Sequence, residues 1–211
     1  MEKSSVTKAT LGRLPAYLEL LRGLPAEEHP YISATTIAKM LSLGEVQVRK
    51  DLAMVSDGGR PKVGYERAAL AEDIARFLGY DNTNDAVLIG AGKLGCALLG
   101  YTGFAEYGLN IAAAFDVAVS AERTECGKPV YPMQMLGQFC RREKILMGII
   151  TVPAAVAQQV CDDLIACGVK AIWNFAPTHL DVPQGILVQN ENMATSLAVL
   201  SKHLSAQMMG Y

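Results

Sequence analysis

The sequence lacks long hydrophobic runs and a strong charge of either sign. No uncharged apolar stretch approaches the roughly 20 residues that a helix needs to cross a bilayer, so we expect no membrane span. The 19 basic and 21 acidic residues give a net charge of -2. The N-terminal stretch MEKSSVTKAT has no apolar core of a secretion signal, which favours a cytoplasmic location.

Cysteine and histidine are also scarce, with 5 and 3 residues respectively. No two cysteines have the C-x-x-C spacing of metal and redox sites, and we predict no metal site. The cysteines are odd in number and lie in apolar or helical contexts, which indicates buried, reduced thiols in a cytosolic protein.

A glycine-rich turn stands out between two apolar runs. The stretch Ala86–Gly95 has the sequence AVLIGAGKLG, which ends in the pattern G-x-G-x-x-G. The next apolar run, LNIAAAFD, ends in Asp116. A strand, a glycine turn, a helix and a second strand with a terminal acid form the fingerprint of dinucleotide-binding proteins. A glycine turn that only packs a helix on a sheet is the alternative.

Each residue type in this fingerprint has a physical role. Gly90 permits a tight turn, Gly92 lets a pyrophosphate approach the backbone, and Gly95 lets the helix pack closely on the sheet. The helix N-terminus offers unpaired N–H groups to phosphate. Asp116 can accept hydrogen bonds from a ribose 2′-OH and would repel a 2′-phosphate, which favours NAD over NADP. The predicted cofactor site also includes Ala91, Lys93 and Leu94.

Strand and helix patterns alternate after the turn, which predicts an α/β fold with a doubly wound parallel sheet of the Rossmann type. The predicted strands are Ala86–Gly90, Leu109–Asp116, Ile145–Val152, Val169–Phe175 and Ile186–Gln189, and the predicted helices are Lys93–Tyr101, Pro132–Glu143 and Pro153–Cys167.

Ligands of such sheets bind beyond the carboxyl ends of the strands, where two further loops are expected. Thr151 and Asn174 would hydrogen-bond a nicotinamide carboxamide. The residues that would flank the ring or shape its loops are Val152, Pro153, Phe175 and Pro177. Ordinary strand ends followed by proline are the alternative.

The first 80 residues contain helical patterns and little strand signal. A helix is expected over Leu11–Arg22, and Ser33 is a good N-cap for the short helix ATTIAKMLS. A turn at Leu43-Gly44 then leads to a helix over Glu45–Val55. Two helices joined by a glycine turn predict a helix-turn-helix, whose second helix reads DNA. A small helical domain with solvated cations is the alternative.

The second of these helices places Arg49 and Lys50 across from its apolar face, where a major-groove reader needs donors. The segment DGGRPKVGY, Asp57–Tyr65, then predicts a basic β-hairpin wing that could enter a minor groove. The predicted DNA contacts are Gln47, Arg49, Lys50, Arg60, Lys62 and Tyr65.

Turn-forming residues at Gly79–Asp85 mark a domain boundary. We expect a DNA-binding domain over 1–80, a nucleotide-binding domain over 81–192 and a terminal helix over 193–211. The helix has an apolar stripe made by Met193, Leu197, Leu200, Leu204 and Met208. Such a stripe must be buried, either on the chain's own sheet or in the partner of a symmetric dimer.

Together these segments resemble the redox-sensing transcriptional repressor family, Rex. The resemblance is carried by RLPAYLELL at Arg13–Leu21, QVRKDL at Gln47–Leu52, VGY at Val63–Tyr65, LIGAGKLGCALLGYTGF at Leu88–Phe104, AAFDV at Ala113–Val117, TVPA at Thr151–Ala154 and NFAP at Asn174–Pro177. It implies a homodimer whose subunits each have a winged-helix domain, a Rossmann domain and a C-terminal helix swapped into the partner. It also implies that NAD⁺ permits operator binding, whereas NADH closes the dimer and releases DNA.

The sequence departs from the family pattern at informative positions. Pro61 separates the two cations of the wing, Glu19 replaces an arginine of the first helix, and Asn192 replaces an aspartate near the last strand. In the family, that arginine and aspartate, with a tyrosine matching Tyr101, link the nicotinamide site to the DNA domain. We therefore include Tyr101 in the cofactor site and expect NADH to release DNA less sharply than in typical members.

A small NAD-dependent dehydrogenase and a CoA-binding domain protein are the alternatives, because both share the glycine turn. A dehydrogenase needs an acid–base group near the nicotinamide, and His179, just after the NFAP segment, is the one candidate. The helix-turn-helix favours the repressor over both. We therefore expect a non-catalytic, NAD(H)-responsive repressor that senses the NADH/NAD⁺ ratio.

Overall fold

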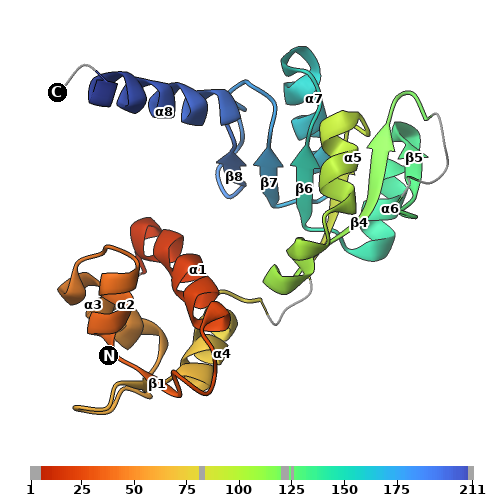
Figure 1. The fold of residues 1–211 in the computed structure, drawn as a ribbon. Coiled ribbons are helices and arrows are strands. Elements are labelled where there is room, and N and C mark those ends of the chain that lie inside the picture. The colour runs from red at the N-terminus through yellow and green to blue at the C-terminus, as the bar shows by residue number, and fades with distance from the viewer. Residues whose placement is uncertain (1–5, 81–83, 120–123, 125, 209–211) are drawn as a thin grey trace. The chain divides into compact units, whose positions relative to one another are not determined.

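The computed structural model describes residues 6–80, 84–119, 124 and 126–208. The chain folds into two units, Met1–Asn82 and Thr83–Tyr211, which are the two halves of the ribbon in Figure 1. In the part of the chain that is described, no helix has the length and apolar character needed to cross a membrane.

The N-terminal unit is mainly helical. Its helices are α1 (Lys8–Gly23), α2 (Ala34–Met40), α3 (Glu45–Val55) and α4 (Arg67–Phe77), and β1 (Tyr31–Ile32) pairs antiparallel with β2 (Tyr65–Glu66). The predicted bounds of α3 and the cap of α2 by Ser33 are confirmed. α1 begins before the predicted Leu11, because the side chain of Thr7 accepts a hydrogen bond from the N–H of Thr10 at 3.1 Å.

The core of this unit is formed by one face of α1 packed against the other helices. The buried members of this face are Leu14, Tyr17, Leu18 and Leu21. They belong to one apolar cluster with Ile37, Val48, Leu52, Leu70 and Ile74. Burial of each large apolar side chain contributes about 1.5–3 kcal/mol, so α1 holds the helix-turn-helix in place.

A short wing, Gly59–Tyr65, follows α3 in the segment where a hairpin was predicted. The N–H of Arg60 donates to the carbonyl of Gly64 at 2.8 Å, and the N–H of Gly64 donates back at 2.9 Å. A Cβ at Gly64 would lie 2.4 Å from the carbonyl oxygen of Ile32. The wing is therefore a short antiparallel hairpin closed between Arg60 and Gly64 and packed against β1.

The C-terminal unit contains one parallel sheet in the order β5-β4-β3-β6-β7-β8. Its elements are β3 (Asn84–Ile89), α5 (Lys93–Gly100), η1 (Thr102–Tyr107), β4 (Leu109–Asp116), β5 (Val130–Pro132), η2 (Met133–Met135), α6 (Leu136–Glu143), β6 (Met147–Ile150), α7 (Ala154–Ala166), β7 (Ala171–Asn174), β8 (Leu187–Asn190) and α8 (Met193–Met208). The strand order reverses between β3 and β6, as in the dinucleotide-binding fold. The predicted doubly wound sheet is confirmed.

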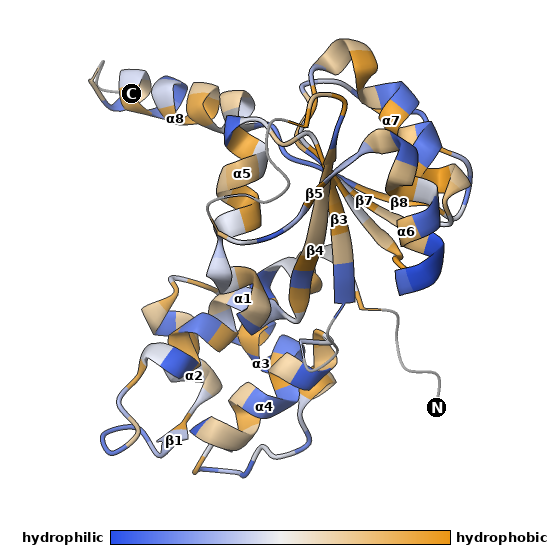
Figure 2. Ribbon diagram, turned by 90° about the vertical axis from the view of Figure 1, so that its right-hand side faces the viewer, coloured by the Kyte–Doolittle hydropathy of each residue, from blue (hydrophilic) through white to orange (hydrophobic). Residues whose placement is uncertain are grey.

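The two faces of the sheet are covered by different helices. α6 and α7 lie on one side and α5 on the other, and the central strands are largely hydrophobic (Figure 2). Val87 and Ile89 of β3 pack in the cluster with α6 and α7, whereas Ala86 and Leu88 pack in the cluster with Leu99 of α5. This alternation follows from the two-residue repeat of a strand buried on both faces.

Some boundaries differ from those predicted. The helix expected over Pro132–Glu143 begins only at Leu136, because Val130–Pro132 forms the edge strand β5 beside Ala114–Asp116 of β4. The residues that follow, Met133–Met135, form a 3₁₀ turn. A three-residue edge strand is too short to show a periodic apolar pattern.

α8 exposes its apolar stripe in the single chain. Leu197, Leu200 and Leu204 are each more than half exposed, and Met208 is 81% exposed. The alternative in which α8 buries this stripe on its own sheet is therefore wrong for these residues. A helix of this kind needs another surface to cover it.

Candidate functional site

The glycine turn lies where the strand order of the sheet reverses. Gly90 directly follows β3, its N–H donates to the carbonyl of Phe115 at 2.8 Å, and the N–H of Thr151 donates to Ile89 at 2.9 Å. The ends of β3, β4 and β6 therefore meet at this turn. Gly90 has a φ of 103°, which is a conformation that glycine adopts without strain.

Close packing of α5 against the turn explains why Gly95, the third glycine of the pattern, has no side chain. A Cβ at Gly95 would lie only 1.9 Å from the carbonyl oxygen of Gly90 and 3.0 Å from the hydroxyl oxygen of Thr151. Only a residue without a side chain lets α5 approach the turn this closely.

The second glycine leaves open space for a ligand. Gly92 is the N-cap of α5, and apart from Gly92 itself and its two chain neighbours no described atom lies within 4 Å of the place where its Cβ would be. Lys93, the first residue of α5, is exposed, and Leu94 and Ala91 are half-buried. The backbone N–H groups at the start of a helix favour an anion, so these residues fit a pyrophosphate.

Asp116, at the end of β4, is tied to the glycine turn. Its Oδ2 accepts a hydrogen bond from the N–H of Ala91 at 2.7 Å, and its Oδ1 accepts one from the N–H of Ala118 at 2.9 Å. An ionised carboxylate has about four acceptor positions. Asp116 can therefore accept ribose hydroxyls while it keeps its backbone partners, which fits the adenosine half of NAD.

The side chain of Thr151 stabilises the glycine turn through hydrogen bonds to its backbone. Its hydroxyl lies 2.8 Å from the carbonyl of Gly90 and 3.0 Å from that of Ile89, and it donates to them. The hydroxyl hydrogen is engaged, so Thr151 could only accept a hydrogen bond from a carboxamide. Val152 is half-buried beside Gly90, and Pro153 is the exposed N-cap residue of α7.

The carboxamide contact expected from the side chain of Asn174 is not supported. Asn174 is fully buried. Its Nδ2 lies 2.8 Å from Oδ1 of Asn190 and 3.0 Å from the carbonyl of Thr178, and its Oδ1 accepts from the N–H of Ala176 at 2.9 Å. Both ends of the amide are used inside the protein. Asn174 therefore shapes the loop that carries the predicted ring contacts.

Phe175 and Pro177, which were predicted to flank the nicotinamide ring, lie at the same edge of the sheet as the glycine turn. The N–H of Phe175 donates to the carbonyl of Ile150 at 2.9 Å, so Phe175 lies beside the residue that precedes Thr151. Its ring centroid is 4.6 Å from that of Trp173. Pro177 is exposed, and with Phe175 it can face a ligand in the position predicted for nicotinamide.

Tyr101 is not brought to the glycine turn within one chain. It is the C-cap of α5, and the eight residues of that helix lie between it and Gly92, a separation of about 13.5 Å at the usual rise per residue. Its exposed ring packs against Phe104 with centroids 4.8 Å apart.

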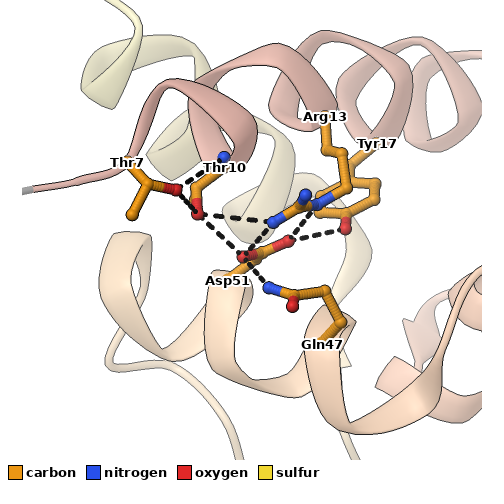
Figure 3. Close-up of polar contacts among 6 residues, drawn as sticks. All are labelled: Thr7, Thr10, Arg13, Tyr17, Gln47 and Asp51. Atoms are coloured by element: carbon orange, nitrogen blue, oxygen red, sulfur yellow. Dashed lines mark hydrogen bonds and ion pairs between the residues drawn. The ribbon is translucent and has the colours of Figure 1, made fainter.

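Sequence reasoning missed a buried polar cluster in the N-terminal unit. Asp51 of α3 is 1% exposed, and its carboxylate accepts hydrogen bonds from donors on α1 and α3 (Figure 3). Arg13 donates to both oxygens at 2.7 and 3.0 Å, and Tyr17 donates at 2.8 Å. Gln47 donates at 2.9 Å and Thr10 at 3.2 Å.

This cluster fixes protonation states as well as positions. Burial raises the pKa of Asp51, but the hydrogen bonds from Arg13, Tyr17 and Gln47 outweigh it, and the net pKa lies below the usual range. The hydrogen bond to Asp51 raises the pKa of Arg13. Burial, followed by the hydrogen bond to Asp51, raises the pKa of Tyr17 to about 12. A charged Asp51 and a neutral Tyr17 therefore persist at neutral pH.

The predicted DNA contacts lie on α3 and on the wing that follows it, where Arg60 and Lys62 are exposed. Gln47, Arg49 and Lys50 are all exposed. Gln47 is held by Asp51, and Arg49 forms an ion pair with Glu45 one turn earlier. Tyr65 is half-buried, and a Cβ at Gly59 would lie 2.9 Å from its ring. Tyr65 therefore supports the wing, and its burial raises its pKa.

The cysteines differ from the expectation of buried thiols. Cys140 and Cys161 are buried, but Cys96 and Cys126 are exposed, and all five are free thiols. Hydrogen bonding to Thr124 lowers the pKa of Cys126, whereas burial raises that of Cys140 to about 11. Among the described residues, no group of His, Cys, Asp and Glu side chains could hold a metal ion.

Known proteins match the chain over nearly its full length. Redox-sensing transcriptional repressor Rex of Porphyromonas gingivalis is 41% identical over 204 residues, which cover 96% of this chain and 94% of the relative. The Rex protein of Treponema denticola is 40% identical over 206 residues, with 95% and 96% covered. The chain belongs to the Rex family. The resemblance drawn from the sequence motifs is thereby confirmed.

A solved Rex-family repressor has the same fold. The crystal structure of RSP in complex with β-NAD⁺ and operator DNA matches with a TM-score of 0.90 at 31% identity, over 98% of this chain and 95% of that one. RSP in complex with β-NADH matches with a TM-score of 0.86 at 30% identity, over 98% and 97%. A family model described as a putative DNA-binding protein N-terminus matches residues 5–53, and one described as a CoA binding domain matches residues 81–178.

Proposed function

We propose that this Rex-family chain is an NAD(H)-responsive, DNA-binding transcriptional repressor that senses the NADH/NAD⁺ ratio. The observation that carries the proposal is the presence, in one chain, of a helix-turn-helix unit and a parallel sheet with an open glycine turn at its switch point. RSP, which has the same fold, forms complexes with β-NAD⁺ and operator DNA and with β-NADH. The boundaries assigned to the three parts are 1–80, 81–192 and 193–211.

The pyrophosphate would lie over the turn Gly90–Gly95, bound by the first N–H groups of α5, with Lys93 at its side. Asp116 would accept the adenosine ribose hydroxyls and exclude a 2′-phosphate. When bound, the cofactor supplies a nicotinamide whose charge differs between its oxidised and reduced forms. The loops at Thr151–Pro153 and Phe175–Pro177 would hold that ring, with Asn174 shaping the second loop from beneath.

The second copy of the chain would cover α8. Leu187 of β8 is 72% exposed, on the same sheet face as Trp173 by strand register, and the stripe of α8 is exposed as well. A soluble protein seldom leaves such apolar surfaces free. A symmetric dimer that exchanges α8 buries them and presents two recognition helices to paired half-sites.

A transcription regulator needs no chemical step, and we assign no catalytic residue. The dehydrogenase alternative rests on His179, which is exposed in the loop after Pro177. The CoA alternative has a specific observation in its favour, because a CoA binding domain model matches the sheet unit. Both domains bind a nucleotide diphosphate at the same glycine turn, so the ligand itself must be tested.

The decisive experiment measures DNA and nucleotide binding by the same protein. Duplexes selected from a random pool by the wild-type chain serve as probes in a gel shift, titrated separately with NAD⁺, NADH and CoA. We expect NADH to release the duplex, and NAD⁺ to leave it bound. Calorimetry should give binding of NADH and NAD⁺ and no binding of CoA. No selected duplex, or release by CoA alone, would overturn the proposed function.

A further inference from the structure

Three consecutive peptide groups of the glycine turn are each held by a hydrogen bond at the carbonyl end. The carbonyl of Gly90 accepts a hydrogen bond from the hydroxyl of Thr151 at 2.8 Å. The carbonyl of Ala91 accepts one from the thiol of Cys96 at 3.2 Å, and the carbonyl of Gly92 accepts one from the N–H of Cys96 at 2.8 Å. Cys96 therefore holds two of the three peptide groups, one with its side chain and one with its backbone.

The direction of each of these carbonyls fixes the direction of the N–H that follows it. A trans peptide group is planar, and its C=O and N–H bonds point in opposite directions. The N–H of Ala91 is engaged inside the protein, since it donates to Asp116 at 2.7 Å. The two carbonyls held by Cys96 belong to the peptide groups that contain the N–H groups of Gly92 and Lys93. These N–H groups lie at the start of α5, where the space beside Gly92 is open.

We propose that Cys96 is a positioning residue for the cofactor, whose thiol holds the peptide group between Ala91 and Gly92 so that the N–H of Gly92 faces the pyrophosphate. This inference rests on the proposed function and adds no further ligand site to it. Among the described residues, no other group donates to the carbonyl of Ala91. Without the thiol hydrogen, this peptide group can rotate, because glycine accepts either sign of φ. The rotation would turn a carbonyl oxygen toward the anion and weaken its binding.

The chemistry of the donor sets the size of the expected effect. A thiol is a weak hydrogen-bond donor and a hydroxyl is a stronger one. Cys96→Ala removes the donor and keeps a residue that favours a helix, so we expect it to weaken binding of the pyrophosphate by about two- to fivefold. Cys96→Ser restores a donor at the same place and should bind the ligand at least as tightly as wild type does.

The test measures the affinities of ADP and NADH by calorimetry with the full chain. ADP has the pyrophosphate of NADH but no nicotinamide, so Cys96→Ala should weaken both ligands by the same factor. Cys96→Ser should restore both affinities. Cys126→Ala is the matched control, because it removes the other exposed thiol, which lies beside Gly100 at the far end of α5. This control should leave the affinity for ADP unchanged.

Two further measurements separate positioning of the turn from general stability. In protein labelled with ¹⁵N at glycine, the amide signal of Gly92, identified by its loss in Gly92→Ala, should move in Cys96→Ala and return toward its wild-type position in Cys96→Ser. Urea unfolding followed by the fluorescence of Trp173 should have the same midpoint in wild type and in Cys96→Ala.

The possible failures have different meanings. Wild-type affinity of Cys96→Ala for ADP would refute the role of the thiol, and so would an equal loss of affinity in Cys96→Ser. A loss confined to NADH would place the effect at the nicotinamide instead, and a lower unfolding midpoint would show that Cys96 acts only on stability. Failure of the wild-type chain to bind either nucleotide would instead refute the proposed function.

Discussion

The carboxylate of Asp51 should be the most costly polar group to remove from the N-terminal unit. It is 1% exposed and accepts hydrogen bonds from Arg13, Tyr17, Gln47 and Thr10. Asp51→Asn keeps the shape but removes the charge and places an amide donor among donors. This substitution is therefore the sharpest test of how α1 holds α3.

The expected magnitude follows from burial and partner number. Removal of one partner of a buried ion pair costs about 3–5 kcal/mol, because the other charge is left without compensation. The side chain of Arg13 is 24% exposed and can regain some hydration, so we expect the lower end, about 3 kcal/mol. Since the net stability of a domain is only about 5–15 kcal/mol, this loss is about a fifth to three fifths of the stability of a typical domain.

Two spectroscopic probes can follow the unfolding of the two units separately. The single tryptophan, Trp173, lies on β7 in the C-terminal unit, so its fluorescence follows that unit alone during urea unfolding. Far-UV circular dichroism also follows the helices of the N-terminal unit. Asp51→Asn should move the dichroism transition to lower urea and leave the tryptophan transition in place. Asp57→Asn, which changes an exposed carboxylate just after α3, is the matched control.

Acid should reduce the difference in stability between the wild-type protein and Asp51→Asn. The pKa of Asp51 is lowered in the folded state, so its contribution to stability is present above the unfolded value of about 3.9 and is lost as pH falls through the folded value. Wild type should therefore approach the Asn variant below about pH 4. An Asp51→Asn protein with wild-type unfolding at pH 7 would refute the reasoning, and so would a stability difference that does not change with pH.

Further substitutions test the cofactor site and the dimer. Asp116→Ala should weaken NADH binding by about 1–3 kcal/mol in calorimetry, because a polar partner of the ligand is lost. Asp85→Ala is the control, since Asp85 accepts a hydrogen bond from Asn110 at the opposite end of the same sheet, and its NADH affinity should not change. An unchanged NADH affinity in Asp116→Ala would remove Asp116 from the site. Leu200→Glu should shift the protein from dimer to monomer in sedimentation velocity and weaken DNA binding, with Lys202→Glu on the same helix as control. A dimer that persists in Leu200→Glu would show that α8 does not form the interface.

The sequence predicted those features that depend on neighbouring residues. The glycine turn and the acid at the end of the next strand define their own geometry, because backbone conformation and strand length place Gly90 and Asp116 at one edge of the sheet. The bounds of α3 were likewise predictable from its apolar face and its glycine turn. In each case the physical cause lies within about 30 residues of chain.

The missed features depend on distant partners or on very short elements. Asp51 lies between Val48 and Leu52, both buried, so its place on an apolar face could have marked it as a buried charge. Its partner Arg13 is on another helix, 38 positions away in sequence, and no local pattern joins them. Asn174 was assigned to a ligand for the same reason, because its saturation by Asn190 and Thr178 becomes visible only in the folded loop.

The altered residues Glu19 and Asn192 set the expected strength of the redox switch. Glu19 is exposed on α1, and Oδ1 of Asn192 accepts a hydrogen bond from the N–H of Thr195 at 3.0 Å at the start of α8. A carboxylate and an amide cannot form the ion pair that the family pattern implies for these positions.

A surface ion pair contributes about 0–1 kcal/mol, whereas a tenfold change in DNA affinity needs about 1.4 kcal/mol of difference between the cofactor forms. The loss should therefore make the NADH response shallower by less than tenfold, without abolishing it. In the gel shift proposed above, NADH should release DNA gradually, since the remaining coupling would come only from the dimer closure that the family resemblance implies. Complete release at micromolar NADH would show that the switch does not depend on these two positions.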